Sequence, residues 1–383
     1  MFSNFLKLKN NLKTEQKIIL DSVKQFCNSY LLPRVKHDYK NENVDFTIFR
    51  EMGKVGLFGI TNEYGINESY LTYGLVAKEI ESIDSGYRSM FSVQNSLVIN
   101  PIYKFGSDYL KQKYLPELVS GNFIGCFGLT EPDHGSDAGN LRSFAIEKEN
   151  GYILNGSKMW ISNAPFADIF IIWAKVNGVL KGFVLEKDFN GLDVSKIKGK
   201  LSLRTSVTGS IFMDNVFVPK KNILNISGFK GPFTCLNDAR MGIAFGVLGA
   251  SETCLDTTLD YLNNRVQFGD SLSSKQVVQY ALGDMLTEHN LSLLSCYHVA
   301  NLRDQNINVK HLPEMISMIK RNSCQKSLNI SRKCRDLLGG NGISEDYPIF
   351  RHLTNLETVN TYEGTETIHA LILGKYLTNK SSF

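Results

Sequence analysis

The chain has 383 residues, of which 43% are hydrophobic and 21% charged, a composition typical of a globular protein large enough for two or three domains. Its net charge of +4 is small for this length, and lysines are scattered among glutamates, so nucleic-acid binding has no electrostatic support. No apolar run approaches the ~20 residues of a transmembrane helix, the seven cysteines include no CxxC, and no HExxH occurs, so the sequence predicts no membrane span, disulfide framework or metal site.

The hydrophobic periodicity changes twice along the chain. From about residue 14 to 120 the spacing is helical, with Pro33, Gly53 and Gly106 as breakers. From about 126 to 225, short β-branched and aromatic runs alternate with turns, and Asn155-Gly156 predicts a hairpin in a small, mainly antiparallel β domain. From about 235 onwards, long helical patterns return and indicate a bundle. The predicted fold class is α+β, mainly α, with domains at residues 1–125, 126–230 and 231–383.

Residues 1–16, MFSNFLKLKNNLKTEQ, carry lysines but no apolar core and no small-residue cleavage site, so they do not resemble a secretory signal. They are also short and lack arginine, which disfavours a mitochondrial transit peptide. A cytoplasmic location is expected, or the mitochondrial matrix if the source is eukaryotic.

Two segments of the β region carry residues suited to a flat ligand. In CFGLTEPDHGSDAGN, residues 126–140, glycines that allow close backbone approach alternate with short polar groups, at Gly128, Thr130, Gly135, Ser136, Asp137 and Gly139. In KMWISN, residues 158–163, Trp160 and Ser162 share one face of a strand and could stack on an aromatic ring and hydrogen-bond its edge. A turn-rich linker and an ordinary core tryptophan are equally compatible with these segments. Neither G-x-G-x-x-G nor a P-loop occurs, so any nucleotide cofactor would be held in another way.

Two further segments carry polar side chains that could bind a ligand, one within a helical pattern and one at a turn after a long helix. In DSGYRSMFSVQNS, residues 84–96, Arg88 and Ser92 lie one helical turn apart and could clamp a carboxylate, although a surface arginine is the simpler interpretation. In NRVQFGDSLSSKQ, residues 264–276, Arg265 and Gln276 flank a turn that follows a long helix.

The segment VNTYEGTETIHALILGKYL, residues 359–377, places a glutamate just before an apolar helix. Helical spacing predicts one buried stripe after Gly364, formed by Ile368, Leu371, Ile372 and Tyr376. Glu363 would lie at the entrance of this helix, beside a packed interior. It is either a first-turn glutamate that complements the helix dipole or a reactive carboxylate.

Seven motifs occur in an order that resembles the acyl-CoA dehydrogenase family: GYRSMFSVQ, CFGLTEP, NGSKMWISN, GPFTCLNDAR, RVQFG, LGGNGIS and NTYEGT. The similarity runs from about residue 14 to 383, and within the family these motifs are similar to those of glutaryl-CoA dehydrogenases. The resemblance implies an N-terminal helical domain, a middle β domain and a C-terminal four-helix bundle. It also implies a homotetramer that binds FAD non-covalently between the β and C-terminal domains.

The resemblance identifies the residues that would hold FAD. The flavin would be lined by Phe127, Leu129, Thr130, Gly135, Ser136, Trp160, Ile161 and Ser162. The FAD of a neighbouring subunit would be reached by Arg265, Gln276, Asp336, Leu337, Leu338, Gly339 and Gly340. The residues after the glutamate, Thr365, Glu366 and Thr367, would also contact FAD.

The resemblance also implies a substrate site. Glu363 would be the catalytic base, and Arg88 and Ser89 would receive a distal carboxylate, whereas Glu81 and Tyr362 match residues of the decarboxylating type. Further contacts to the acyl-CoA would come from Ser92, Ser136, Phe233, Asn237, Arg240, Gly364 and Phe383.

The implied reaction is FAD-dependent α,β-dehydrogenation of glutaryl-CoA, with decarboxylation to crotonyl-CoA and CO₂. Electrons would pass to electron-transferring flavoprotein, as in lysine and tryptophan degradation. A non-decarboxylating glutaryl-CoA dehydrogenase and a short-chain acyl-CoA dehydrogenase remain open, and release of CO₂ separates them. An oxidase and a flavin-free acyl-CoA-binding protein are further alternatives, and a colourless preparation would indicate the latter.

Overall fold

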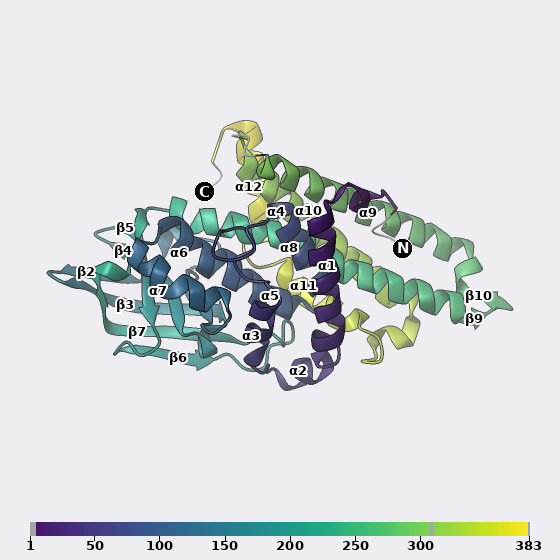
Figure 1. Cartoon of the computed structure of the whole chain (residues 1–383). Helices are drawn as coiled ribbons and strands as arrows, with labels where there is room; N and C mark the ends of the chain where they lie inside the picture. Colours follow the sequence, from purple (N-terminus) through teal and green to yellow (C-terminus); the bar gives the residue numbers. More distant parts are fainter. Residues whose placement is uncertain (1–4, 306–308, 382–383) are drawn as a thin grey trace.

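The N-terminal part of the chain is helical in the computed structural model, which describes residues 5–305 and 309–381 (Figure 1). Its α helices are α1 (Thr14–Phe26), α2 (Val35–Asn41), α3 (Thr47–Lys54), α4 (Tyr70–Glu81), α5 (Ser85–Ser92), α6 (Asn100–Phe105) and α7 (Asp108–Val119). Two π-helical segments, Cys27–Leu31 and Val93–Ile99, extend α1 and α5. Phe383, assigned to the substrate from the sequence, lies outside the described residues.

The break between α4 and α5 has a local cause. Asp84 is extended, and its carboxylate accepts the N–H of Gly86 as the N-cap of α5. The same carboxylate accepts hydrogen bonds from Thr205 Oγ1 at 2.6 Å and from Asn355 Nδ2 at 2.9 Å. One buried acid therefore ties the start of α5 to the β region and to a C-terminal helix.

A single mixed sheet forms the middle of the chain, and its strands lie at one end of the molecule (Figure 1). The strands are β1 (Gly125–Gly128), β2 (Phe144–Lys148), β3 (Gly151–Ser162), β4 (Ile169–Val176), β5 (Val179–Glu186), β6 (Leu192–Lys196), β7 (Thr208–Pro219) and β8 (Ile223–Ser227). Their order is β6-β7-β3-β2-β4-β5-β8, with β1 added beside β4. The sheet is mainly antiparallel, as predicted, but β4 pairs in parallel with β1 and β2.

The prediction of a hairpin at Asn155-Gly156 is wrong, because this pair lies inside β3. Gly156 has φ +135°, and the register of β3 on β7 shifts there, so the pair forms a β-bulge. A Cβ atom at Gly156 would lie 2.4 Å from Ser143 Oγ, so the close approach of the loop before β2 requires glycine at this position of β3. An Asn-Gly hairpin turn does occur at Asn177-Gly178, which connects β4 to β5 and has positive φ at both residues.

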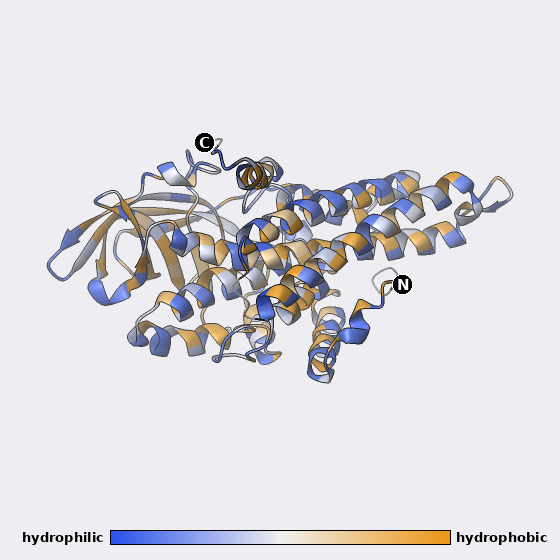
Figure 2. Cartoon of the chain, turned by 90° about the horizontal axis from the view of Figure 1, so that it is seen from above, coloured by the Kyte–Doolittle hydropathy of each residue, from blue (hydrophilic) through white to orange (hydrophobic). Residues whose placement is uncertain are grey.

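The C-terminal part consists of long helices that run away from the sheet (Figures 1 and 2). They are α8 (Lys230–Asn264), α9 (Gln276–Asp304) and α10 (Leu312–Leu337), followed by the shorter α11 (Ile349–Val359) and α12 (Glu366–Thr378). A small hairpin of β9 (Val266–Gln267) and β10 (Asp270–Ser271) joins α8 to α9 at the end of the molecule opposite the sheet (Figure 1).

The prediction of one buried stripe on α12 is also wrong. His369 is the buried residue of this helix, whereas Tyr376 is 45% exposed and Ile368, Leu371 and Ile372 are half-buried. The apolar pattern is present, but α12 packs chiefly on α10 within this chain. An apolar face can be covered by another subunit as well as by the chain's own core, and the periodicity does not distinguish the two.

The main hydrophobic core spans the N-terminal helices, α8 to α11 and one face of the sheet, and a second cluster lies within the β region. All seven cysteines are buried as free thiols. Within the described part of the chain, no helix has both the length and the hydropathy needed to cross a bilayer.

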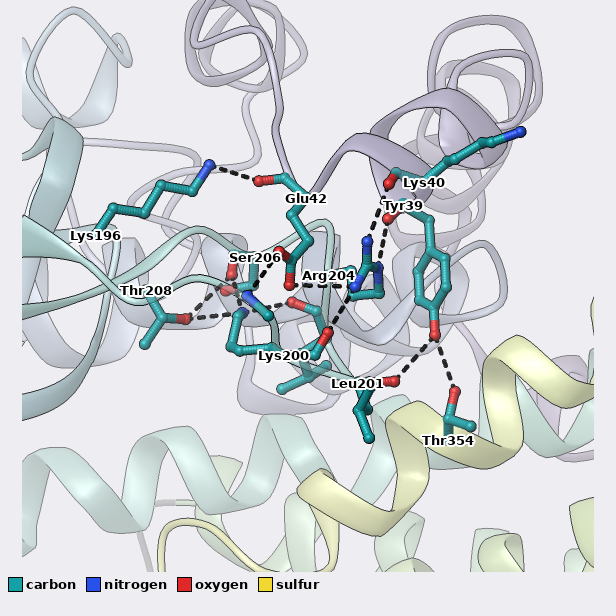
Figure 3. Close-up of polar contacts among 12 residues, drawn as sticks. Tyr39, Lys40, Glu42, Lys196, Lys200, Leu201, Arg204, Ser206, Thr208 and Thr354 are labelled. Carbon is teal, nitrogen blue, oxygen red and sulfur yellow. Dashed lines mark hydrogen bonds and ion pairs between the residues drawn. The ribbon is translucent and has the colours of Figure 1, made fainter.

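The loop 197–207 connects the three parts of the chain (Figure 3). Arg204 donates to two main-chain oxygens of α2, and Lys200 donates to the carbonyl oxygen of Ser206. The carbonyl oxygen of Val207 accepts the N–H of Asn163, just after β3. The end of β3 is therefore fixed against helices from other parts of the chain.

Candidate active site

Glu363 lies in the turn between α11 and α12, outside the first turn of α12. Its backbone is left-handed, with φ +52°, and Gly364 follows with φ +99°. The N-cap of α12 is Thr365, and the acidic residue in its first turn is Glu366. The dipole interpretation of Glu363 therefore does not describe this structure.

The carboxyl group of Glu363 faces a buried, cationic interior. Its Oε2 atom is buried and has no hydrogen-bond partner among residues 5–305 and 309–381. Burial raises the pKa of Glu363, although the positive charges of Arg88, Arg240 and Lys320 oppose the increase. A carboxylate that is desolvated and not hydrogen-bonded through Oε2 is suited to act as a base.

Three successive carbonyl oxygens of the turn are held by cationic side chains. Lys320 Nζ donates to the carbonyl oxygens of Tyr362 at 2.9 Å and Gly364 at 2.8 Å. Arg240 Nε donates to the carbonyl oxygen of Glu363 at 2.9 Å. The main chain around Glu363 is thus fixed from α8 and α10.

Arg88 lies on α5 and is 1% exposed, so it is not the surface arginine that the simpler interpretation expected. Its Nε donates to Glu81 Oε2 at 2.5 Å, and its Nη2 donates to the hydroxyl of Tyr362. Burial would lower the pKa of Arg88, but Glu81 and Tyr362 raise it, so the guanidinium is charged. A Cβ atom at Gly246 of α8 would lie 2.2 Å from Glu81 Oε2, so this glycine makes room for the ion pair.

Hydroxyl groups line the next turn of α5. Ser89 and Ser92 are both buried, and Ser92 Oγ is 3.1 Å from the hydroxyl oxygen of Tyr73. That hydroxyl also lies 2.7 Å from Ser96 Oγ, and burial raises the pKa of Tyr73 to about 12. Tyr73 is a neutral hydrogen-bonding group beside the ion pair, and the sequence interpretation did not include it.

The segments assigned to the flavin meet where β1 and β3 end. Phe127 and Leu129 are buried beneath this point, and Met159 donates its N–H to the carbonyl oxygen of Thr130 at 2.9 Å. Trp160 interrupts the strand with φ +62° beside a second register shift, and its side chain is 56% exposed. Ile161 is buried, whereas Ser162 is partly exposed.

A buried ion pair stabilises these two segments against each other. Lys158 Nζ lies 2.8 Å from Glu131 Oε1, and the Glu131 carboxylate also accepts the N–H groups of Arg142 and Ser143. Burial would raise the pKa of Glu131, but these partners lower it to about 2. The next segment, with Gly135 and Ser136, is exposed.

The remaining predicted residues lie in three places. Phe233 and Asn237 are in the first turns of α8, and Arg240 follows them on the same helix. Arg265 and Gln276 lie at the hairpin end of the molecule, opposite the sheet (Figure 1). The segment Asp336, Leu337, Leu338, Gly339 and Gly340 ends α10, and Asn341 just beyond it contacts Tyr261 near the end of α8. Within one chain, the structure brings neither Arg265 and Gln276 nor residues 336–340 together with Trp160.

Comparison with known proteins identifies the family of this arrangement. Residues 13–122 match the N-terminal domain of acyl-CoA dehydrogenases, residues 126–216 match the middle domain, and residues 227–378 match the C-terminal domain. An acyl-CoA dehydrogenase of Bacillus subtilis (strain 168) is 36% identical over 95% of this chain and 98% of its own length. The chain belongs to the acyl-CoA dehydrogenase family.

Two glutaryl-CoA dehydrogenases are among the similar proteins. The crystal structure of a glutaryl-CoA dehydrogenase from Mycobacterium smegmatis, in complex with FADH2, has a TM-score of 0.97 and 39% identity and covers 100% of this chain and 99% of its own. The glutaryl-CoA dehydrogenase of Desulfococcus multivorans is 33% identical over 95% of this chain and 96% of its own length.

As a member of this family, the protein is an FAD-dependent oxidoreductase that dehydrogenates acyl-CoA thioesters. The residues present fit a flavin. Trp160 offers an exposed indole near the end of β3, and hydroxyl groups flank it at Thr130, whose carbonyl oxygen accepts the N–H of Met159, and at Ser162, the last residue of β3. An aromatic face and short hydroxyl groups are what a planar, hydrogen-bonding ring system requires.

Several residues of the site were not found from the sequence. Lys320 had a detectable signal, because it falls on the buried stripe of α10 between Ile316 and Cys324, where an apolar residue is expected. Tyr73 had no such signal, since its hydrogen-bonding partners Ser92 and Ser96 lie on another helical segment and only the fold brings them near.

Proposed function

We propose that the protein is a decarboxylating glutaryl-CoA dehydrogenase in which Glu363 is the catalytic base and Arg88 binds the distal carboxylate. The observation that carries this proposal is the buried guanidinium of Arg88, held by Glu81 and Tyr362, the residue next to the proposed base. A plain acyl chain gives no reason to bury an arginine at this position, because a buried charge is costly unless it has partners.

Charge balance favours a dicarboxylic substrate. Arg88, Arg240 and Lys320 surround Glu363, and Glu81 is the other acid of the group, so the cluster carries a net charge of +1 when both carboxyls are ionised. A substrate with a free carboxylate neutralises this charge, whereas a fatty acyl chain leaves it uncompensated. Arg88 has more N–H donors than its two partners use, so a second carboxylate can bind.

The α-proton of the thioester is removed by Glu363. Bound acyl-CoA excludes water from the carboxylate, which strengthens it as a base, and hydrogen bonds to the thioester oxygen stabilise the enolate. FAD, when bound against Trp160, supplies the acceptor for the hydride that leaves the β-carbon. Arg240 and Lys320 keep the turn in place while the proton moves to Glu363.

Decarboxylation follows from the position of the second carboxylate. After dehydrogenation the γ-carbon that bears the carboxylate is attached to a double bond conjugated with the thioester, so the electron pair left by departing CO₂ is delocalised onto the thioester oxygen as a dienolate. Protonated Glu363 then returns its proton to the terminal carbon and gives crotonyl-CoA. Arg88 must orient the carboxylate without stabilising it so strongly that CO₂ is retained, and its existing partner Glu81 shares the positive charge.

We further propose a homotetramer with domains at residues 1–125, 126–230 and 231–383 that passes electrons to electron-transferring flavoprotein. Large apolar residues exposed on α9 and α12, including Val277, Tyr280, Leu291 and Leu377, support burial against other subunits. Arg265, Gln276 and residues 336–340 then reach a neighbour's FAD, which would account for their separation from Trp160 in one chain.

The deciding experiment mixes purified yellow protein with glutaryl-CoA and follows flavin bleaching and products together. Bleaching with release of CO₂ and crotonyl-CoA supports the proposal. Bleaching with glutaconyl-CoA as the final product indicates the non-decarboxylating reaction, and bleaching only with butyryl-CoA indicates a short-chain enzyme.

The carboxylate assignment has a separate test. Arg88→Ala is expected to raise KM for glutaryl-CoA far more than KM for butyryl-CoA, since only the first substrate presents a carboxylate. Equal losses on the two substrates would assign Arg88 a structural role instead.

A further inference from the structure

Lys320 is a buried cation that, among residues 5–305 and 309–381, donates no hydrogen bond to a carboxylate. It is 1% exposed on α10, and its two hydrogen bonds within this part of the chain go to main-chain oxygens. Burial lowers the pKa of Lys320, so keeping a charged ammonium group at this position costs desolvation free energy. A methionine of similar length would avoid that cost, which indicates that the two hydrogen bonds serve a purpose.

The two oxygens that Lys320 binds flank the proposed base. They belong to Tyr362 and Gly364, and between them Glu363 adopts φ +52°, a left-handed conformation that is unfavourable for a non-glycine residue. A single ammonium bound to both neighbours closes the turn around that conformation. The bond from Arg240 to the Glu363 carbonyl oxygen fixes the same peptide from another helix.

We propose that Lys320 is a positioning residue that sets the direction of the Glu363 side chain through the main chain of the turn. The inference rests on the proposed role of Glu363 as the base. Lys320 does not touch the reacting atoms in this account, and it acts by preventing the turn from relaxing to a conformation in which the carboxylate points elsewhere. A displacement of about 1 Å at the reacting group costs up to about 100-fold in rate.

Two arguments separate this role from ordinary packing. The neighbours of Lys320 on the buried stripe of α10, Ile316 and Cys324, need no cation to pack. The site also contains other charged or titratable groups near Glu363: the cations Arg88 from α5 and Arg240 from α8, the acid Glu81 from α4, and the neutral groups Tyr73 from α4, Tyr362 of the same turn and His369 from α12. A pH profile therefore has to be compared between variants that differ only at residue 320.

The test uses the FAD-loaded enzyme and the variants Lys320→Met and Lys320→Arg. Lys326→Met is the matched control, because Lys326 lies on the same helix but is partly exposed and pairs with Glu288. FAD content, thermal melting and acyl-CoA binding are measured first, and flavin reduction in a single turnover follows. Wild-type enzyme that glutaryl-CoA and butyryl-CoA both fail to reduce would reject the proposed function itself, independently of Lys320.

We expect Lys320→Met to bind acyl-CoA within about threefold of wild type and to reduce its flavin about 100-fold more slowly. Loss of the positive charge also raises the pKa of Glu363, so the acidic limb of the pH profile moves to higher pH. Lys320→Arg keeps the charge but cannot place one ammonium between both oxygens. Its rate of flavin reduction should therefore fall, while the acidic limb of its pH profile stays at the wild-type pH. If the methionine variant does not hold FAD, the arginine variant alone tests the proposal, because it should lower the rate without moving the pH profile.

A second measurement avoids the flavin. Exchange of the α-protons of acetyl-CoA in D2O requires a base but no hydride acceptor, because this thioester has no β-carbon. Exchange is expected to fall in Lys320→Met by the same factor as flavin reduction, and to stay at the wild-type level in Lys326→Met.

The double variant with Glu363→Gln gives the decisive comparison. If Lys320 acts through Glu363, adding Lys320→Met to Glu363→Gln causes little further loss of the residual rate. An equal fractional loss in both backgrounds, or a Lys320→Met enzyme within about threefold of the wild-type rate, overturns the proposal.

Discussion

Replacing Arg88 by methionine should destabilise the protein, because the variant leaves Glu81 buried without its cation. Arg88 and Glu81 are 1% and 0% exposed, and Arg88 Nε lies 2.5 Å from Glu81 Oε2. Removing one partner of such a pair costs about 3–5 kcal/mol, most of which is the penalty of the uncompensated charge. With an unfolding entropy of about 2.1 cal/mol/K per residue, 383 residues give about 0.8 kcal/mol/K, so the melting temperature should fall by about 4–6 °C.

The control is the double variant Glu81→Gln/Arg88→Met, which removes both charges and is expected to recover most of the lost melting temperature. Melting is measured at one protein concentration with saturating FAD, because ligand and subunit association shift the apparent stability. Both variants should lose the preference for glutaryl-CoA over butyryl-CoA, since neither retains the guanidinium. A single variant as stable as wild type, or a double variant no more stable than the single one, would refute the account of a buried, coupled pair.

Three further predictions concern individual residues. Glu363→Gln should retain FAD and lose nearly all turnover, and because burial raises the pKa of this carboxyl, ionised Glu363 destabilises the folded state at neutral pH. The variant should therefore melt at a higher temperature than wild type at pH 8, with the difference shrinking towards pH 4. Gly246→Ala places a Cβ atom 2.2 Å from Glu81 Oε2, so steady-state kinetics should show a larger loss on glutaryl-CoA than on butyryl-CoA. Lys158 and two main-chain N–H groups lower the pKa of Glu131 to about 2, so the ionised carboxylate stabilises the fold above pH 4.5 and this contribution is lost on acidification towards pH 2. Glu131→Gln should flatten that part of the stability profile in acid-unfolding titrations.

Much of the architecture was predictable from the sequence because the hydrophobic period changes with the kind of element. The helical, β and helical zones follow directly from that change, and the breaks at Asp84 and Thr365 obey local capping rules. The contact between Arg88 and Tyr362 was different, since 274 residues separate the pair and no local pattern links them. Only the family resemblance placed the two side chains in one site.

The wrong predictions share a physical cause. Asn155-Gly156 has the chemistry of a tight turn, but a β-bulge uses the same left-handed glycine, and only the neighbouring strand decides between them. The apolar pattern of α12 was recognised correctly, yet its burial depends on what lies outside the helix. In both cases the local signal gave the conformation or the polarity, and tertiary contacts decided the outcome.

The way the turn at Glu363 is held resolves a conflict between position and basicity. A cation bonded directly to the carboxylate would fix its position, but it would also lower its pKa and weaken the base. Lys320 Nζ and Arg240 Nε instead donate to main-chain oxygens of the turn, while Oε2 of Glu363 has no partner among the described residues. The positive charges still act through space, but burial outweighs them and the pKa of Glu363 is raised. An enzyme that must remove a weakly acidic α-proton gains from this arrangement, because the proposed base is oriented by groups that do not use its lone pairs.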